Sequence, residues 1–147
     1  MTQVIAGNAV HAGSGVSTVL ANVAALMAAT QPASRVGVID ACLSAPTLHL
    51  LFGLPQHAFR HTLNDFLLGT CRLEDAIHPI PVNAASDPAQ QLLLIPADPD
   101  VTAVTKAARW TTTVEPLATS CLQLAADLDL DFLLLDTEAG LPPSTLA

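Results

Sequence analysis

Short apolar segments alternate along the chain with longer segments in which apolar residues recur at helical spacing. The apolar segments have the length and composition of buried strands, and they lie at residues 4–6, 35–40, 91–95 and 132–136. The other segments predict helices at residues 17–29, 46–51, 62–68, 72–77, 101–110 and 115–127. Strands that alternate with helices predict a three-layer α/β fold, in which a parallel sheet has helices on both faces.

Local signals set the expected ends of these elements. Ser17 and Thr18 are good N-cap residues, so they are expected to begin the first helix. Residues 78–90 contain three prolines and several small polar side chains, which predicts a surface loop. The most apolar stretch, residues 16–29, is too short to span a bilayer and contains Asn22, which favours a buried helix.

The composition narrows the class of protein. The chain has 147 residues, the length of one domain spanning 1–147, and 51% of them are hydrophobic while 3% are aromatic. The core is therefore expected to be aliphatic. With five Lys and Arg residues and a net charge of −8, the chain lacks the basic patch that nucleic acids or acidic membrane surfaces require.

The cysteines and the N-terminus indicate the compartment. Cys42, Cys71 and Cys121 are odd in number and form no C-x-x-C pair, which predicts reduced, buried thiols. The first residues do not have the basic and apolar regions of a signal peptide. These features predict a cytoplasmic protein.

The segment after the first predicted strand carries the candidate chemistry. It contains Gly13 and Gly15 and leads directly into a helix. In this layout the loop N–H groups and the positive end of the helix dipole bind phosphate, and a hydroxyl such as that of Ser17 can reach Mg²⁺. Asp40 and Asp136 each end a predicted strand, so both are expected at the carboxyl edge of the sheet, where ligands bind. Each feature alone also fits an ordinary turn or helix cap; their order along the chain favours a nucleotide site.

The same segment resembles the deviant Walker A loop of MinD/ParA-type P-loop ATPases, K-G-G-V-G-K-S/T-T-T-x-x-N-L-A. Residues 11–24 read H-A-G-S-G-V-S-T-V-L-A-N-V-A and align with it without a gap through Asn22. The resemblance implies that Mg²⁺ is bound by Ser17, Asp40 and Asp136. It implies that the phosphates of ATP are bound by Gly13, Ser14, Gly15, Val16, Ser17 and Thr18.

Later segments resemble further motifs of this family. Residues 36–42, V-G-V-I-D-A-C, resemble its strand motif V-x-L/V-I/V-D-x-D. Residues 44–54 and 63–67 are similar to S-P-x-x-H-x-L-F-G-L and L-N-D-Y-L of a MinD-like subgroup. Residues 128–137 resemble the Walker B strand, and Gly140 with Leu141 the switch turn after it. The resemblance implies a P-loop NTPase-type sheet, of whose domain this chain is the N-terminal portion, incomplete at the C-terminus.

Three charged positions of the family motif are changed in this chain. The lysine that reaches the β- and γ-phosphates aligns with Val16, and the signature lysine that contacts the partner's nucleotide across a dimer aligns with His11. The second Asp of switch I, which orients the attacking water, aligns with Cys42. A charged hydrogen bond contributes roughly 1.5–3 kcal/mol, so the loss of both lysines is expected to weaken ATP binding on the order of a hundredfold or more. Hydrolysis should suffer further, and no catalytic residue is assigned.

Three functions follow from this pattern. The first is a degenerate ATP-binding domain with weak or no hydrolysis, which regulates the positioning or assembly of a cellular structure. The second is a slow ATPase that uses a lysine from a partner or from elsewhere in the chain, where Lys106 is the only lysine. The third is an interaction module that binds no nucleotide. The family resemblance implies a homodimer or a protein partner, and no segment corresponds to a membrane-targeting helix.

Other patterns compete for a role. His57 and His61 have the spacing of zinc ligands on one helix face, but no further ligand completes a site, so a polar surface helix is the alternative. Cys42 is a conceivable nucleophile at the active edge, although no base is close in sequence. Trp110 with Arg109 fits either ligand stacking or core packing.

Overall fold

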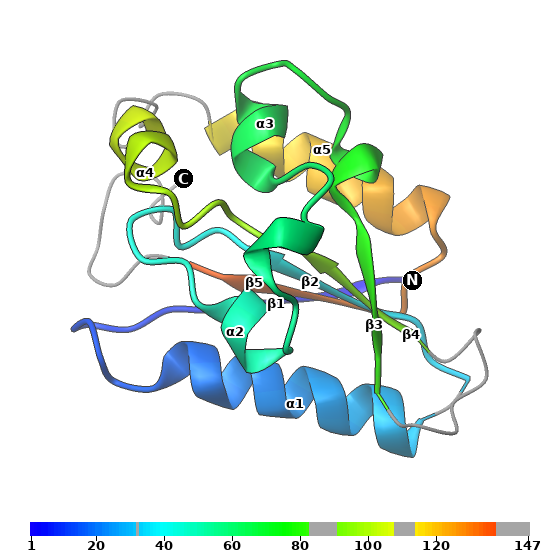
Figure 1. Ribbon diagram of the computed structural model, residues 1–147. Coiled ribbons are helices and arrows are strands. Elements are labelled where there is room, and N and C mark those ends of the chain that lie inside the picture. The colour runs from blue at the N-terminus through cyan, green and yellow to red at the C-terminus, as the bar shows by residue number, and fades with distance from the viewer. Residues whose placement is uncertain (32, 83–90, 108–113, 138–147) are drawn as a thin grey trace.

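A five-stranded sheet forms the centre of the computed structural model (Figure 1), which describes residues 1–31, 33–82, 91–107 and 114–137. The predictions for Arg109, Trp110, Gly140 and Leu141 lie outside the described residues. The strand order is β1-β5-β2-β4-β3. The strands are β1 (Gln3–Gly7), β2 (Val36–Asp40), β3 (His78–Pro81), β4 (Gln91–Ile95) and β5 (Phe132–Asp136).

The predicted strands are all present and run parallel to one another. β5 lies between β1 and β2 and is parallel to both, and β2 is parallel to β4. Parallel neighbours that are not consecutive in sequence need crossover connections, which the helices provide. The prediction of an α/β fold with a parallel sheet is confirmed for these four strands.

The prediction of a surface loop over residues 78–90 is wrong for its first part, where β3 lies, and residues 83–90 lie outside the described residues. His78–Pro81 pairs antiparallel with β4 at the edge of the sheet. Burial alternates along it, with His78 and Ile80 buried and Pro79 and Pro81 exposed. Proline lacks an N–H and is tolerated on an edge strand, where one side of the backbone has no neighbour. The prolines therefore indicated an edge strand rather than the absence of a strand.

Five helices and two 3₁₀ turns connect the strands in the described ranges. They are α1 (Val16–Thr30), α2 (Leu48–Leu51), α3 (Leu63–Leu67), α4 (Val101–Ala107), α5 (Val114–Asp127), η1 (Gln56–Ala58) and η2 (Leu73–Ala76). The predicted helix at 72–77 is one of the 3₁₀ turns. The prediction that Ser17 and Thr18 cap the first helix is also wrong, because the N-cap is Gly15, with φ 83°, and both hydroxyls lie in the first turn.

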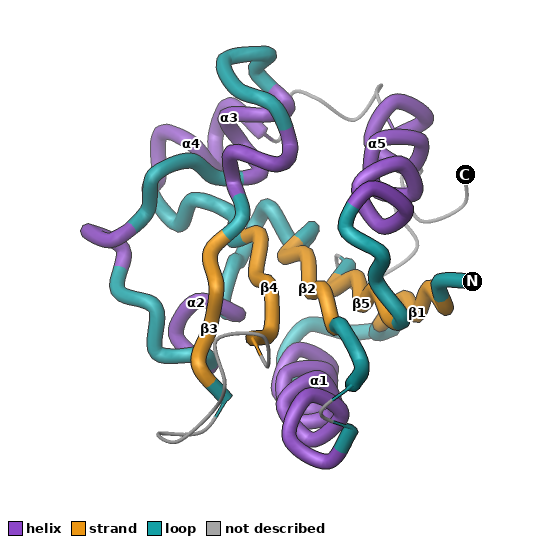
Figure 2. Tube along the Cα trace, turned by 90° about the vertical axis from the view of Figure 1, so that its right-hand side faces the viewer, coloured by secondary structure: helices purple, strands orange, loops and turns teal. Residues whose placement is uncertain are grey.

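The helices cover the two faces of the sheet, as Figures 1 and 2 show from perpendicular directions. On one face, α1 and α2 pack with Val36, Val38 and Leu94 of the strands. On the other face, α3, η2 and α5 pack with Ile39, Ile95 and Leu133, side chains that alternate with the first set. Both clusters are almost entirely aliphatic, which confirms the expected core composition.

α1 is only partly the buried helix that its composition predicts. Its sheet-facing side chains, Leu20, Ala21, Ala24 and Ala28, are buried. Val19, Val23 and Leu26 are 63%, 37% and 62% exposed, because a helix in an outer layer buries only one side. The thiols show the same partial agreement: all three cysteines are free, but Cys121 alone is buried and the others are partly exposed.

Candidate functional site

The carboxyl ends of three parallel strands meet at one edge of the sheet. In the ladder, Gly7 at the end of β1 pairs with Asp136 at the end of β5, and Asp136 pairs with Asp40 at the end of β2. The sheet register thus places the two candidate carboxylates on neighbouring strands, next to the start of the glycine loop. The residues predicted from sequence to share this edge do so.

The loop between β1 and α1 is exposed and glycine-dependent. Gly13 and Gly15 have φ of 80° and 83°, which side chains with a Cβ rarely adopt, and both face open space. The first α1 hydrogen bond from this loop runs from the N–H of Val19 to the carbonyl of Gly15, at 2.9 Å. The N–H groups before Val19 therefore have no acceptor within the helix and lie at its positive end. This arrangement suits a phosphate group.

Gly7 lets α1 approach β1 closely. A Cβ on Gly7 would lie 2.7 Å from Leu20 Cδ1 and 3.0 Å from Val16 Cγ1. Both side chains come from the first two turns of α1, so their contact with Gly7 fixes where the helix begins relative to the sheet. Val16, which occupies the position of the family lysine, is half-buried against this strand end.

Asp40 is buried and held by backbone donors. Its Oδ2 accepts from the N–H groups of Thr47, at 3.2 Å, and Leu48, at 3.1 Å, and its Oδ1 accepts from that of Cys42, at 3.3 Å. Burial raises the pKa of Asp40 to about 7; the charge of Asp136 raises it further, while the backbone hydrogen bonds lower it. Asp40 thus fixes the segment that leads into α2 and carries a poorly solvated carboxyl group.

Asp136 is the carboxylate that faces the loop. It is buried, and burial raises its pKa, while the interaction with the Ser17 hydroxyl lowers it. Its Oδ2 has no hydrogen-bond partner among the described residues. An orphaned carboxylate oxygen beside a hydroxyl is a donor set that Mg²⁺ accepts, with phosphate and water oxygens completing the shell. Ser17 and Asp136 therefore fit a magnesium ion, and Asp40 adjoins them with both oxygens engaged.

A hydrogen-bonded clamp that sequence reasoning missed joins β1 to β5 beside this pair. The Asn8 side chain donates to Thr137 Oγ1, at 3.1 Å, and the Thr137 hydroxyl donates to the carbonyl of Gly7, at 2.8 Å. The signal in the sequence is a polar residue directly after each strand. The clamp holds the start of the loop against the end of β5.

The loop has no cationic side chain of its own. Residues 8–18 contain neither Lys nor Arg, and His11 is exposed. Arg35 precedes β2 and so lies at the opposite edge of the sheet from the loop. Lys106 is on α4, which Figure 1 shows on the face of the sheet opposite α1. A lysine supplied by this chain to its own loop, one of the predicted alternatives, therefore has no support in the described structure.

The other sequence candidates do not form sites. His57 lies in a 3₁₀ turn and His61 precedes α3, so the two do not share a helix face as predicted. The described residues contain no group of three or more His, Cys, Asp or Glu side chains arranged to hold a metal ion. Cys42 is partly exposed next to Asp40 and uses its backbone N–H to bind that carboxylate.

Solved structures with this fold are informative. The septum site-determining protein MinD from Pyrococcus horikoshii, in complex with Mg-ADP, superposes with a TM-score of 0.78 at 27% identity, over 99% of this chain and 53% of that one. The cell division ATPase MinD from Pyrococcus furiosus gives a TM-score of 0.76 at 26% identity, over 99% and 54% of the two chains. This chain has the fold of MinD and related ParA-type P-loop ATPases.

The MinD fold is shared with a wider group. Cobyrinic acid a,c-diamide synthase from Mycobacterium smegmatis, with bound ADP and magnesium, gives a TM-score of 0.72 at 22% identity, over 99% of this chain and 55% of that chain. The chain spans about half the length of the structures it resembles. No protein-family model matches the sequence, and no curated protein matches it. Among the described residues, no helix has both the length and the apolar character to cross a membrane.

Proposed function

We propose that this chain is a MinD-like nucleotide-binding domain, the N-terminal portion of one, that binds Mg-ADP and Mg-ATP weakly and hydrolyses ATP slowly or not at all. The observation that carries the proposal is the meeting of the glycine loop, the first turn of α1 and the Ser17–Asp136 pair at one edge of the sheet. The first-turn N–H groups of α1 bind the phosphate, and Gly13 and Gly15 let the backbone come close to it.

Magnesium would be held by Ser17 and Asp136, and Asp40 would support the ion from the neighbouring strand. When bound, Mg²⁺ offsets the negative charge of the phosphates, which otherwise face two buried carboxylates. The Ser17 hydroxyl interacts with Asp136 in this structure and lowers its pKa. Ser17 would give up this interaction to hold the ion, and the neutral loop N–H groups would orient the phosphate.

Weak hydrolysis is expected because the loop has no cationic side chain and the position that orients water carries no carboxylate. Phosphoryl transfer depends on positioning and on cationic stabilisation of the developing charge. Here the lysine positions carry Val16 and His11, and the position that orients water carries Cys42. We therefore place this cytoplasmic domain in a regulatory role, in the positioning or assembly of a cellular structure, acting through a homodimer or a protein partner.

A slow ATPase aided by a partner is the second candidate. The observation in its favour is that the loop is exposed, with open space around Gly13 and Gly15. A second chain can reach this loop with a cationic side chain. In that case hydrolysis appears only in the presence of the partner, whereas the first candidate stays inactive with or without it.

Calorimetric titration of Mg-ADP and Mg-ATP into the purified protein tests the proposal. Binding in the high micromolar to millimolar range is expected, weakened about tenfold or more by Asp136→Asn when magnesium is present, since a charged contact is lost. Asp127→Asn, which makes the same change at an exposed residue of α5, is the matched control. No binding at millimolar nucleotide would instead support the interaction module. Turnover equal to that of intact MinD proteins would refute the degenerate ATPase.

A further inference from the structure

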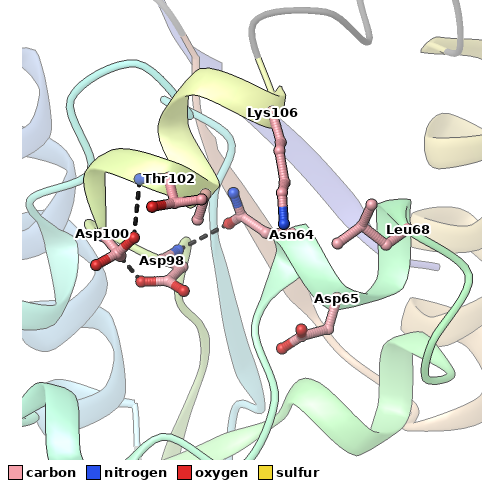
Figure 3. Close-up of a pocket in the computed structure, with 8 residues that line it drawn as sticks. Asn64, Asp65, Leu68, Asp98, Asp100, Thr102 and Lys106 are labelled. Atoms are coloured by element: carbon pink, nitrogen blue, oxygen red, sulfur yellow. Dashed lines mark hydrogen bonds between the residues drawn. The ribbon is translucent and has the colours of Figure 1, made fainter.

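A polar pocket lies away from the glycine loop, between α3, the segment that follows β4, and α4 (Figure 3). Its volume is about 210 Å³, and its polar lining comes from Asn64, Asp65, Asp98, Asp100, Thr102 and Lys106. It shares no residue with the candidate nucleotide site. In the sheet, β5 and β2 separate β4 from β1, where the glycine loop begins.

Asn64 shows that this pocket lacks a partner for a buried donor. The residue is 4% exposed, and its Oδ1 accepts a hydrogen bond of 2.7 Å from the N–H of Asp98. That bond fixes which end of the amide is the oxygen. The Nδ2 group therefore points the other way, and it has no acceptor among the described residues. A buried N–H donor without a partner costs free energy of folding, so a ligand that places an acceptor against Asn64 Nδ2 would be stabilised.

Donors and acceptors lie on different sides of the pocket. Asn64 and Lys106 both line the pocket, and Figure 3 shows the Lys106 side chain reaching from α4 toward α3 and the Asn64 amide nitrogen, from α3, directed toward α4. Asp98 and Asp100 line the adjoining wall, where Asp98 Oδ1 accepts from the Asp100 N–H at 2.9 Å and Asp100 Oδ1 accepts from the Thr102 N–H at 2.8 Å. These bonds orient the two carboxylates, and Asp98 Oδ1 also accepts a hydrogen bond of 3.5 Å from Gln56 Nε2. The Thr102 hydroxyl and the N–H of Ala103 also interact with Asp100.

The positions of the donors and the carboxylates determine which charges a ligand of this pocket should carry. A bare metal cation fits poorly, because the inward Asn64 donor repels it. A phosphate fits poorly too, because three carboxylates line the pocket against one lysine. A ligand is favoured that carries an anionic oxygen for Asn64 and Lys106 and a cationic group for Asp98 and Asp100. The cavity is smaller than the roughly 300–1,000 Å³ of pockets for drug-sized ligands, so the ligand is about the size of an amino acid.

We propose that the pocket between α3 and α4 binds a basic amino-acid unit, whose carboxylate contacts Asn64 and Lys106 and whose cationic side chain contacts Asp98 and Asp100. Free arginine or lysine has this chemistry, and so does the C-terminal residue of a peptide that ends in either. The proposal is independent of nucleotide binding, because none of these residues belongs to the glycine loop or to the Ser17–Asp136 pair.

Calorimetry at constant ionic strength tests the pocket with four probes: L-arginine, the peptide Gly-Gly-Arg, agmatine, which lacks the carboxylate, and acetate, which lacks the cation. Arginine or the peptide is expected to bind at least tenfold more tightly than agmatine and acetate. The tighter of the two identifies the source of the ligand. Absence of binding by both at millimolar concentration, or equal binding by agmatine, overturns the proposal.

Variants locate the binding. Lys106→Met and Asp100→Asn change exposed side chains at the pocket and should each weaken binding tenfold or more, with unfolding curves that show an intact fold. Asn64→Ala should weaken it as well. The matched control is Asp127→Asn on α5, which lines no part of the pocket and should bind as the parent does. An equal loss in the control would show that the effect is one of overall charge and would overturn the proposal.

Discussion

Replacing Val16 with lysine introduces a cation at the first position of α1, directly after the glycine loop. If the loop retains phosphate-binding geometry, the new ammonium group gains a charge-assisted hydrogen bond worth roughly 1.5–3 kcal/mol. The affinity for Mg-ADP and Mg-ATP should then rise about 10- to 150-fold.

The same change should lower the stability of the nucleotide-free protein. A cation at a helix N-terminus opposes the helix dipole by about 0.3–1 kcal/mol. Val16 is half-buried, and its Cγ1 lies close to Gly7, so part of its packing is lost as well. The aliphatic stem of lysine retains some of that contact. We therefore expect a loss of about 1–2 kcal/mol in unfolding free energy without nucleotide.

Calorimetry with Mg-ADP and Mg-ATP measures the gain in affinity, and urea unfolding measures the loss of stability. The matched control is Val23→Lys, which adds the same charge to the same helix at a residue that is 37% exposed. It lies about 10 Å further along the axis, near the screening distance in physiological salt. If both variants are folded and Val16→Lys binds no better than Val23→Lys, the loop is not a phosphate site and the nucleotide proposal is refuted.

Three further predictions concern pH, packing and thiol reactivity. Burial raises the pKa of Asp40 to about 7, so between about pH 4 and 7 the folded state retains a proton that the unfolded state has lost. In EDTA, the free energy of unfolding should therefore fall by a few kcal/mol as the pH rises from about 4 to 7, and then level off. Asp40→Asn should flatten most of this slope in urea unfolding, and an unchanged slope contradicts the assignment. Gly7→Ala should cost about 1–3 kcal/mol, because its Cβ meets Leu20 Cδ1 at 2.7 Å; a stability equal to the parent's would show that α1 shifts freely. Burial raises the pKa of the Cys121 thiol to about 11, so a thiol reagent at pH 8 should modify the two partly exposed cysteines first and Cys121 only on unfolding. Three equal rates would contradict the structure.

Much of the fold was predictable because its signals are local. Apolar runs bounded by turn residues identified the four parallel strands, and helical spacing identified α1 and α5 within a few residues. The sequence misled where tertiary context decides. Pro79 and Pro81 suggested a loop, but they occupy the exposed positions of an edge strand. The hydroxyls near the start of α1 suggested caps, but Gly15 turns the chain into the helix before them.

The candidate site divides in the same way. Its residue types and order along the chain were visible in the sequence, including the position where valine replaces the family lysine. The partner of each carboxylate was not visible. Asp40 is held by three backbone N–H groups, whereas Asp136 faces Ser17 and keeps an unpaired oxygen, although both residues end an apolar strand. Asn64 likewise appeared only as part of a motif until packing left its amide nitrogen without an acceptor.

The sequence by itself determined the fold class, the aliphatic core and the absence of a cation from the loop, because periodicity, composition and residue identity are properties of the chain. Only the tertiary structure decided which strands are neighbours, and therefore that Gly7, Asp136 and Asp40 line up at one edge. The reason is physical. Strand order and register come from the packing of helices on both faces of the sheet. The same packing buries each carboxylate and leaves the Asn64 amide nitrogen without an acceptor.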